Sequence, residues 1–337
     1  MRRALFFFVC LTMLVTSCQW SPASWRPKGD DGVKLKIHRY DRVVDEFVSL
    51  NSFSSLQRMN VEYPMATRLL IEDVLAIGSV EEPRIEQRLR RFYMDSTMQV
   101  LLEDVHNKYA DLDAEEEELS KVFGQIKQSD PDFKIPQVYT QISGLNQSMV
   151  VGDSILGISL DKYLGHDYSL YKKYYHDYQR QMMDRCRLVP DALFYYLTHE
   201  YPLFPKQTYT LLDYVVDYGK IHWVIARCRN ISLAEEAGFD EERVKRFREN
   251  EGKVWQWLEE HHALESSDTL LIQDLMEPHE SLFCGVVDAP SQIGLWIGLQ
   301  IVDHYMKKHP EVTVGQLLQA EDYKTLFRES GYHPTTK

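Results

Sequence analysis

The chain has 337 residues, of which 44% are apolar and 26% are charged, and its formal net charge is −13 at pH 7. This globular composition excludes a largely disordered chain, a collagen, a disulfide-dense scaffold and a polytopic membrane protein. The acidic balance argues against nucleic acid as a partner, because phosphate binding needs a basic surface. The length allows about two domains or one large one.

The N-terminus has the pattern of a secretory signal. Met1-Arg2-Arg3 is basic, residues 4–15 are mainly apolar, and Thr16-Ser17 are small. The run is too short to span a bilayer, which takes about 20 apolar residues. Val15-Thr-Ser-Cys18 resembles a bacterial lipobox, which implies that residues 1–17 are removed and that Cys18 carries a diacylglyceryl thioether. An ordinary signal peptide with a chance cysteine is the alternative. Loss of two arginines would leave a formal charge of −15.

The mature chain is expected to consist of a tether and one body. Residues 18–34 mix Pro, Ser, Gly and charge without a period, which is typical of a flexible linker. No similar break divides residues 35–330, so we expect a single domain over residues 35–337. Three cysteines remain after Cys18, which allows at most one internal disulfide. Two of them, Cys186 and Cys228, lie in helical patterns and are expected to be small core residues.

Helical signals dominate from Arg39 onward. Pro64 and Pro83 each precede apolar residues at helical spacing, and proline favours the first helical position. Four acids at residues 115–118 can attract cations. We expect them instead to form the first turn of a helix whose inner face is apolar, because negative charge suits a helix N-terminus.

The spacing of the apolar residues then changes from helical to alternating, and it returns to helical further along the chain. Residues 135–142 alternate, and residues 148–152 and 154–160 are short β-type runs joined near Gly152-Asp153. Helices are expected again at Tyr178–Cys186, Pro190–Tyr201, Gln207–Cys228, Asp240–His262, Pro290–His309 and Val314–Arg328. The predicted fold is therefore mostly α with a small antiparallel β element (α+β).

Five segments in order carry a resemblance to a known family. They are Val151–Gly165, Val189–Pro202, Thr210–Lys220, Asn250–Trp255 and Ala289–Val302. Behind a lipobox, they resemble the gliding-motility lipoprotein GldB of Bacteroidota over residues 35–335. The resemblance implies a lipid-anchored envelope protein required for gliding, which binds other envelope proteins and has no assigned reaction.

The membrane that holds the anchor is predicted from the residues after Cys18. Gln19 and Trp20 offer no evident inner-membrane retention signal, and Asp30-Asp31 lie too far from the lipid to act as a surface-export tag. We expect the outer membrane, with the body facing the periplasm.

The same segments also resemble gluzincin metallopeptidases, more distantly. Those enzymes use H-E-x-x-H on a helix, with a glutamate on a following helix as the third zinc ligand. Here His199-Glu200 matches the first two positions, but Leu203 stands where the second histidine is needed. Tyr218 stands where the third ligand is needed. The resemblance therefore implies a gluzincin-like layout that lacks an intact zinc motif.

His199 and Glu200 are accordingly degenerate positions, expected at a helix end with hydrogen bonds to the chain. A substitute ligand set of His199, Asp217 and His222 is conceivable, since His222 lies on the same helix as Asp217. It would make the protein a membrane-tethered metallopeptidase with an atypical site, and this is the alternative function. We expect no metal, no cofactor and no catalytic residue.

Other candidate sites are weaker. His261 and His262 adjoin on a helix, so their side chains diverge by about 100°. Gly294 and Gly298 are expected to allow close helix packing. A run of aromatic residues either lines a groove or packs in the core, and core packing is expected. It comprises Tyr163, Tyr168, Tyr171, Tyr174, Tyr175, Tyr178, Phe194, Tyr195 and Tyr196.

Overall fold

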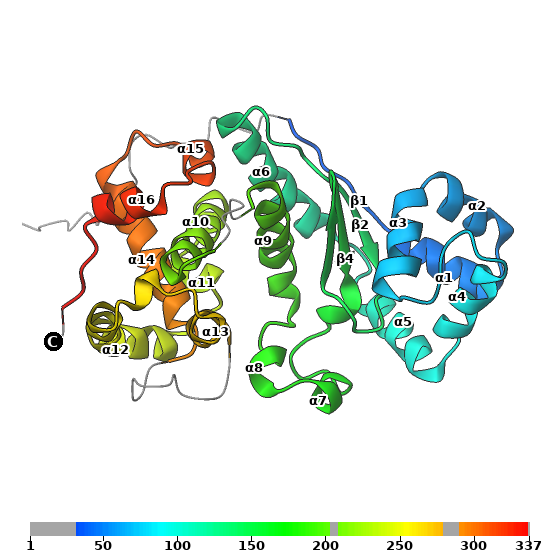
Figure 1. Cartoon of the computed structure of the whole chain (residues 1–337). Coiled ribbons are helices and arrows are strands. Elements are labelled where there is room, and N and C mark those ends of the chain that lie inside the picture. Colours follow the sequence, from blue (N-terminus) through cyan, green and yellow to red (C-terminus); the bar gives the residue numbers. More distant parts are fainter. Residues whose placement is uncertain (1–31, 203–207, 279–289, 336–337) are drawn as a thin grey trace, which may run out of the picture.

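The computed structural model describes residues 32–202, 208–278 and 290–335. N-terminal helices form one end of the molecule, a small sheet with two long helices forms the middle, and C-terminal helices form the other end (Figure 1). The buried apolar side chains of these parts belong to one cluster, which extends along the chain from Leu35 to Tyr332.

The N-terminal end is built from short helices. They are α1 (Tyr40–Leu50), α2 (Phe53–Val61), α3 (Pro64–Arg68), a π-helix (Leu69–Val74) that continues α3, α4 (Ile85–Tyr93) and α5 (Ser96–Lys108). Pro64 occupies the start of α3, as predicted. In α1 the apolar face made by Val43, Val44 and Phe47 is buried.

The sheet is mixed. Its strands are β1 (Ile37–His38), β2 (Gln137–Gln141), β3 (Met149–Gly152) and β4 (Ile155–Ser159), in the order β1-β2-β4-β3. Only β3 and β4 are antiparallel, while β2 pairs in parallel with both β1 and β4. The mostly α, α+β class is confirmed, and the expected antiparallel pairing holds for the β3–β4 hairpin alone. The reason is that β3 occupies the sheet edge, so its hairpin partner β4 lies between β3 and β2 and runs in the same direction as β2.

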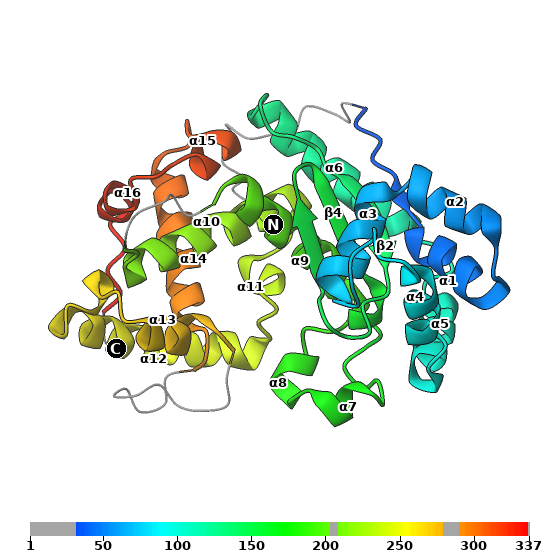
Figure 2. The same ribbon diagram turned by 45° about the vertical axis from the view of Figure 1, so that its right-hand side comes forward.

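Two long helices flank this sheet. They are α6 (Asp113–Ser129), which begins with the acidic turn as predicted, and α9 (Leu188–Glu200). In α6 the residues Leu119, Val122 and Phe123 are fully buried. Two one-turn helices, α7 (Tyr171–Tyr174) and α8 (Asp177–Arg180), connect the sheet to α9 (Figure 2).

The described residues of the C-terminal end form helices joined by loops, without a strand. Its elements are α10 (Leu211–Arg229), α11 (Leu233–Glu236), α12 (Glu241–Glu260), α13 (Thr269–Met276), α14 (Ile293–Lys308), α15 (Val314–Leu318) and α16 (Tyr323–Ser330). A single helix was expected over residues 314–328, but the chain breaks it after Leu318. Two contacts satisfy the backbone at the break. The buried amine of Lys220 donates to the carbonyls of Leu318 at 3.3 Å and Ala320 at 2.8 Å, and the Asp322 side chain caps the start of α16.

Helix α14 packs closely on its neighbours through glycines. A Cβ on Gly294 would lie 2.9 Å from the Leu275 carbonyl oxygen, and one on Gly298 would overlap the Val215 carbonyl. The predicted role of these glycines in close packing is confirmed. Within the described ranges, no helix combines the length and apolarity that crossing a bilayer requires.

Candidate functional site

The two degenerate positions lie at the C-terminal end of α9. His199 is exposed, and within the described residues its side chain makes no hydrogen bond. The expected bond to the chain stays a prediction, because residues 203–207, which follow α9, lie outside the described residues. Glu200 lies near Tyr196, whose pKa is raised by burial and further by the charge of Glu200. Leu203 lies outside the described residues.

The substitute ligand set is not assembled. Asp217 is buried and accepts from the Tyr323 hydroxyl at 2.9 Å, with the Lys220 amine at 3.2 Å. His222 is also buried, and its Nδ1 lies 3.3 Å from Glu236 Oε1. In the part of the chain that the structure describes, no three His, Cys, Asp or Glu residues are grouped so as to hold a metal ion.

Glu236 is the centre of a buried ionic network. Its carboxylate, fully buried, accepts from Arg229 at 2.9 Å and contacts His222. Arg229 also binds Glu118 at 2.6 Å, and Arg187 donates to the Glu236 carbonyl at 2.5 Å. A buried carboxylate is tolerated when its partners satisfy it. The network thus joins α6, α10 and α11 and has a structural role.

Arg187 extends this network to α9. Its second guanidinium nitrogen lies 3.0 Å from Asp191, which also accepts from Tyr163 at 3.0 Å. Burial raises the pKa of Asp191, and the charge of Arg187 opposes the rise. Both Asp191 oxygens are therefore engaged by protein groups.

A row of aromatic rings crosses from α10 to α9. Ring centroids are 5.9 Å apart for Tyr209 and Tyr214, 6.2 Å for Tyr214 and Tyr218, and 5.4 Å for Tyr218 and Phe194. His222 stacks on Phe194 at 4.7 Å. Burial raises the pKa of Tyr218. Tyr218, at the position of the third zinc ligand in the gluzincin frame, is thus a packing residue. Its spacing of four from Tyr214 was the available sequence signal.

The aromatic run identified in the sequence is only partly core. Tyr163, Tyr171 and Tyr196 are buried, as expected, whereas Tyr174 and Tyr195 are exposed. Of these two exposed residues, Tyr195 adjoins the aromatic row, because its ring centroid lies 5.8 Å from that of Phe194.

The cysteines also differ from one another. Cys228 is buried, as expected, but Cys186 is exposed, so the core prediction is wrong there. Cys186 lies in a 3-10 turn, Arg185–Arg187, whose flanking arginines bind Glu115 and the α11 region. Those contacts turn the thiol outward. Cys284 and Cys18 lie outside the described residues.

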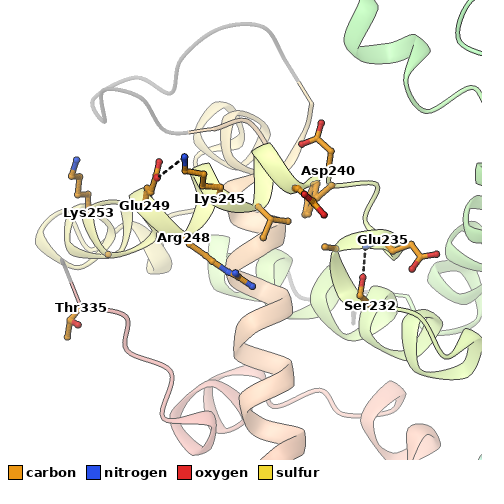
Figure 3. Close-up of a pocket in the computed structure, with 13 residues that line it drawn as sticks. Ser232, Glu235, Asp240, Lys245, Arg248, Glu249, Lys253 and Thr335 are labelled. Carbon is orange, nitrogen blue, oxygen red and sulfur yellow. Dashed lines mark hydrogen bonds and ion pairs between the residues drawn. The ribbon is translucent and has the colours of Figure 1, made fainter. Parts of the chain in front are cut away.

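A concave site lies along α11 and α12 (Figure 3). It is a groove of about 1040 Å³, with Ala234, Phe239 and Val244 among its apolar lining residues. Arg248 projects away from the ion pair that Lys245 and Glu249 form on the outer side of α12.

The groove combines its apolar side chains with charges of both signs. The acidic lining residues are Glu235, Asp240, Glu241 and Glu249, and the basic ones are Lys245, Arg248 and Lys253. Arg248 makes no ion pair or hydrogen bond within the described ranges, so its guanidinium remains available to an anionic group. Sequence reasoning missed this site. The available signal was the spacing of the cations Lys245, Arg248 and Lys253 along one helix.

Comparison with known proteins gives one family. No curated protein and no solved structure matches the chain, so the gluzincin-like layout is not confirmed. The family model described as gliding motility protein GldB matches residues 23–334. That range includes every helix and strand described above, and the chain therefore belongs to the gliding motility protein GldB family.

Proposed function

We propose that the protein is a lipid-anchored, non-catalytic component of the cell envelope that serves gliding-type motility by binding other envelope proteins. The observation that carries this proposal is the family match over residues 23–334. It begins five residues after Cys18, so the matched region is nearly the whole mature chain.

The anchor in this proposal is an acylated Cys18, left after removal of residues 1–17. Residues 18–34 are the tether and residues 35–337 a single body. Support comes from the lipobox-like sequence and from the core cluster, whose first member is Leu35. The anchor would lie in the outer membrane, with the body facing the periplasm.

The non-catalytic part of the proposal is supported by the contacts that two residues of the substitute ligand set already make. Asp217 is engaged by Lys220 and Tyr323, and His222 by Glu236 and Phe194. These contacts leave His199 alone among the three candidate ligands. The alternative, a membrane-tethered metallopeptidase with an atypical zinc site, rests on the exposure of His199 at the end of α9.

Complementation and metal analysis together test the proposal. In a gliding strain that lacks the protein, we expect wild-type, His199→Ala and Glu200→Ala chains to restore spreading equally, and the pure protein to hold no stoichiometric zinc. One zinc per chain, with loss of motility in both variants of a stably folded protein, would establish the peptidase instead.

The anchor has its own test. Mass spectrometry of the mature protein should show residues 1–17 absent and acyl mass on Cys18, and Cys18→Ala should leave the membrane fraction. Density-gradient separation and protease shaving of whole cells decide the location. Digestion of the body in intact cells would overturn the periplasmic orientation.

A further inference from the structure

Exposed apolar side chains gather at the N-terminal end of the molecule. Of the large hydrophobic residues that are exposed in the described ranges, most lie between residues 50 and 100. Leu50 is 75% exposed and Phe53 79%, and both stand at the turn between α1 and α2. Val61 and Met65, 71% and 55% exposed, stand at the turn between α2 and α3.

One arc of the outer face of α2 carries no charge, and it is bounded at the end of the helix by the exposed ion pair of Arg58 and Glu62. At 100° per residue, Phe53, Gln57, Asn60 and Val61 fall within an arc of about 100°. All four are exposed. An uncharged, apolar-tipped face is unusual on a chain whose mature formal charge is −15.

A basic segment adjoins this face. Residues 84–91 contain four arginines and one glutamate. Arg90 donates to Asn51 at 2.6 Å, which places α4 against the turn after Leu50. Arg90 and Arg91 form no ion pair with any described residue, unlike Arg88, which binds Glu82. Apolar side chains beside arginines that lack a carboxylate partner, of which Arg91 is the exposed one, are the combination that binds an anionic lipid surface.

A tether from an acylated Cys18 would hold the whole body near a bilayer. Residues 19–31 span at most about 45 Å when fully extended. The described chain begins beside α6 in the middle of the molecule, where the Leu35 amide donates to Ser120, and then runs through β1 to α1 (Figures 1 and 2). A body held within that distance meets the bilayer at high effective concentration, so even a contact of low intrinsic affinity is sufficient to dock it. Its net negative charge disfavours every orientation except one that turns a neutral or basic face to the lipid.

We propose that the α1–α2–α3 face and the arginines of α4 form a second membrane contact, which docks the body on an anionic bilayer surface. The occupant is the lipid headgroup region, with the four apolar side chains inserted and Arg90 and Arg91 at the phosphates. This docking rests on the proposed lipid anchor for its biological setting, but its chemistry resides in residues 50–91.

Vesicle flotation tests the docking without the anchor. The probe is the mature chain with Cys18→Ser, mixed with vesicles of phosphatidylethanolamine and phosphatidylglycerol or of phosphatidylcholine alone. We expect binding to the anionic vesicles that weakens with salt. The double variant Leu50→Ser, Phe53→Ser should lower the partition coefficient about tenfold or more, because two apolar side chains no longer insert into the bilayer. Arg91→Glu should lower it about fivefold on anionic vesicles only.

Two matched variants serve as controls. Leu270→Ser removes a residue that is 71% exposed on α13, at the other end of the molecule, and Lys324→Glu reverses an exposed charge on α16. Neither should change binding, and unchanged circular dichroism and Tm would show that all variants fold. Absence of vesicle binding, or equal losses in the controls, would overturn the docking.

The two proposals can fail separately. A Cys18 without acyl mass in cells refutes the anchor while the vesicle result stands. Normal acylation with vesicle binding that is insensitive to Leu50 and Phe53 refutes the docking alone. If those two substitutions abolish gliding but leave vesicle binding unchanged, the face binds a protein and the membrane contact is wrong.

Discussion

Gly219 of α10 and Gly298 of α14 lie back to back, so close that a Cβ on Gly219 would stand 2.6 Å from the Gly298 carbonyl carbon and oxygen. These two helices form the most extensive packing in the C-terminal end, and Gly219 directly follows Tyr218 of the aromatic row. The residue next to the third-ligand position of the peptidase resemblance therefore lies at a helix crossing.

The first prediction concerns this crossing. Gly219→Ala and Gly298→Ala should each lower the free energy of unfolding by about 1–3 kcal/mol, because the added methyl group meets backbone atoms that cannot yield. Gly124→Ala is the matched control on α6. Its methyl group would meet Val33 at an ordinary 3.5 Å, so higher helix propensity should stabilise the protein by up to about 1 kcal/mol. Urea unfolding followed by circular dichroism measures all three. Wild-type midpoints for Gly219→Ala and Gly298→Ala would contradict the packing account.

The second prediction separates the two histidines of the conceivable zinc site. His222→Ala should cost about 1–3 kcal/mol, since it removes a buried ring from Phe194 and a hydrogen-bond partner from Glu236. His199→Ala should change stability by no more than about 0.5 kcal/mol, because the side chain is exposed. Thermal unfolding with and without a chelator is the measurement. A chelator-sensitive Tm that either substitution abolishes would mean that the two imidazoles share a metal.

Much of the fold followed from local patterns. The acidic first turn of α6, the proline start of α3 and the β3–β4 hairpin are each set by residues adjacent in sequence. The parallel pairing of β2 with β4 was not predictable in this way, because it depends on which strand takes the sheet edge. The carbonyls at the break after Leu318 accept from Lys220, about a hundred residues earlier, and that contact could not be read from the local pattern.

The sites were less predictable than the fold for the same reason. Cys186 has the spacing of a core residue, but contacts of the neighbouring arginines with α6 and α11 turn it outward. The groove on α12 needs α11 and the C-terminal segment at Thr335 to complete it. Exposure of Phe53 could not be read from its type, since an aromatic residue at a helix start is usually assigned to the core.

The third prediction is a pH dependence at Asp130. Burial alone would raise the pKa of this carboxyl, but hydrogen bonds from Tyr201 at 2.6 Å, Gln319 at 2.9 Å and the Asp132 amide hold it below its usual value. A lowered folded-state pKa gives stability that is present above the unfolded value of about 4 and is lost as the pH falls through the folded value.

Asp130→Asn should therefore destabilise the protein by about 1–2 kcal/mol at pH 7 and flatten the fall in stability below about pH 4. Asp132→Asn, an exposed neighbour, is the control and should leave both unchanged. Urea midpoints between pH 3 and 7 give the comparison. An unaltered acid limb in Asp130→Asn would show that the carboxylate does not provide this stability.

The last prediction concerns the groove on α11 and α12. This groove and the α2 face lie at opposite ends of the molecule (Figure 1), so docking α2 on the bilayer leaves the groove open to an envelope partner. A photo-cross-linking residue at Val244 should capture a partner in cells, whereas one at Gln256, exposed on α12 outside the groove, should not. Arg248→Glu should weaken that capture about tenfold and reduce spreading, because it reverses a charge that lines the groove. Lys324→Glu makes the same charge change on α16 and should have no effect. Equal cross-linking at both positions, or full motility in a stably expressed Arg248→Glu strain, would remove the groove from the proposed function.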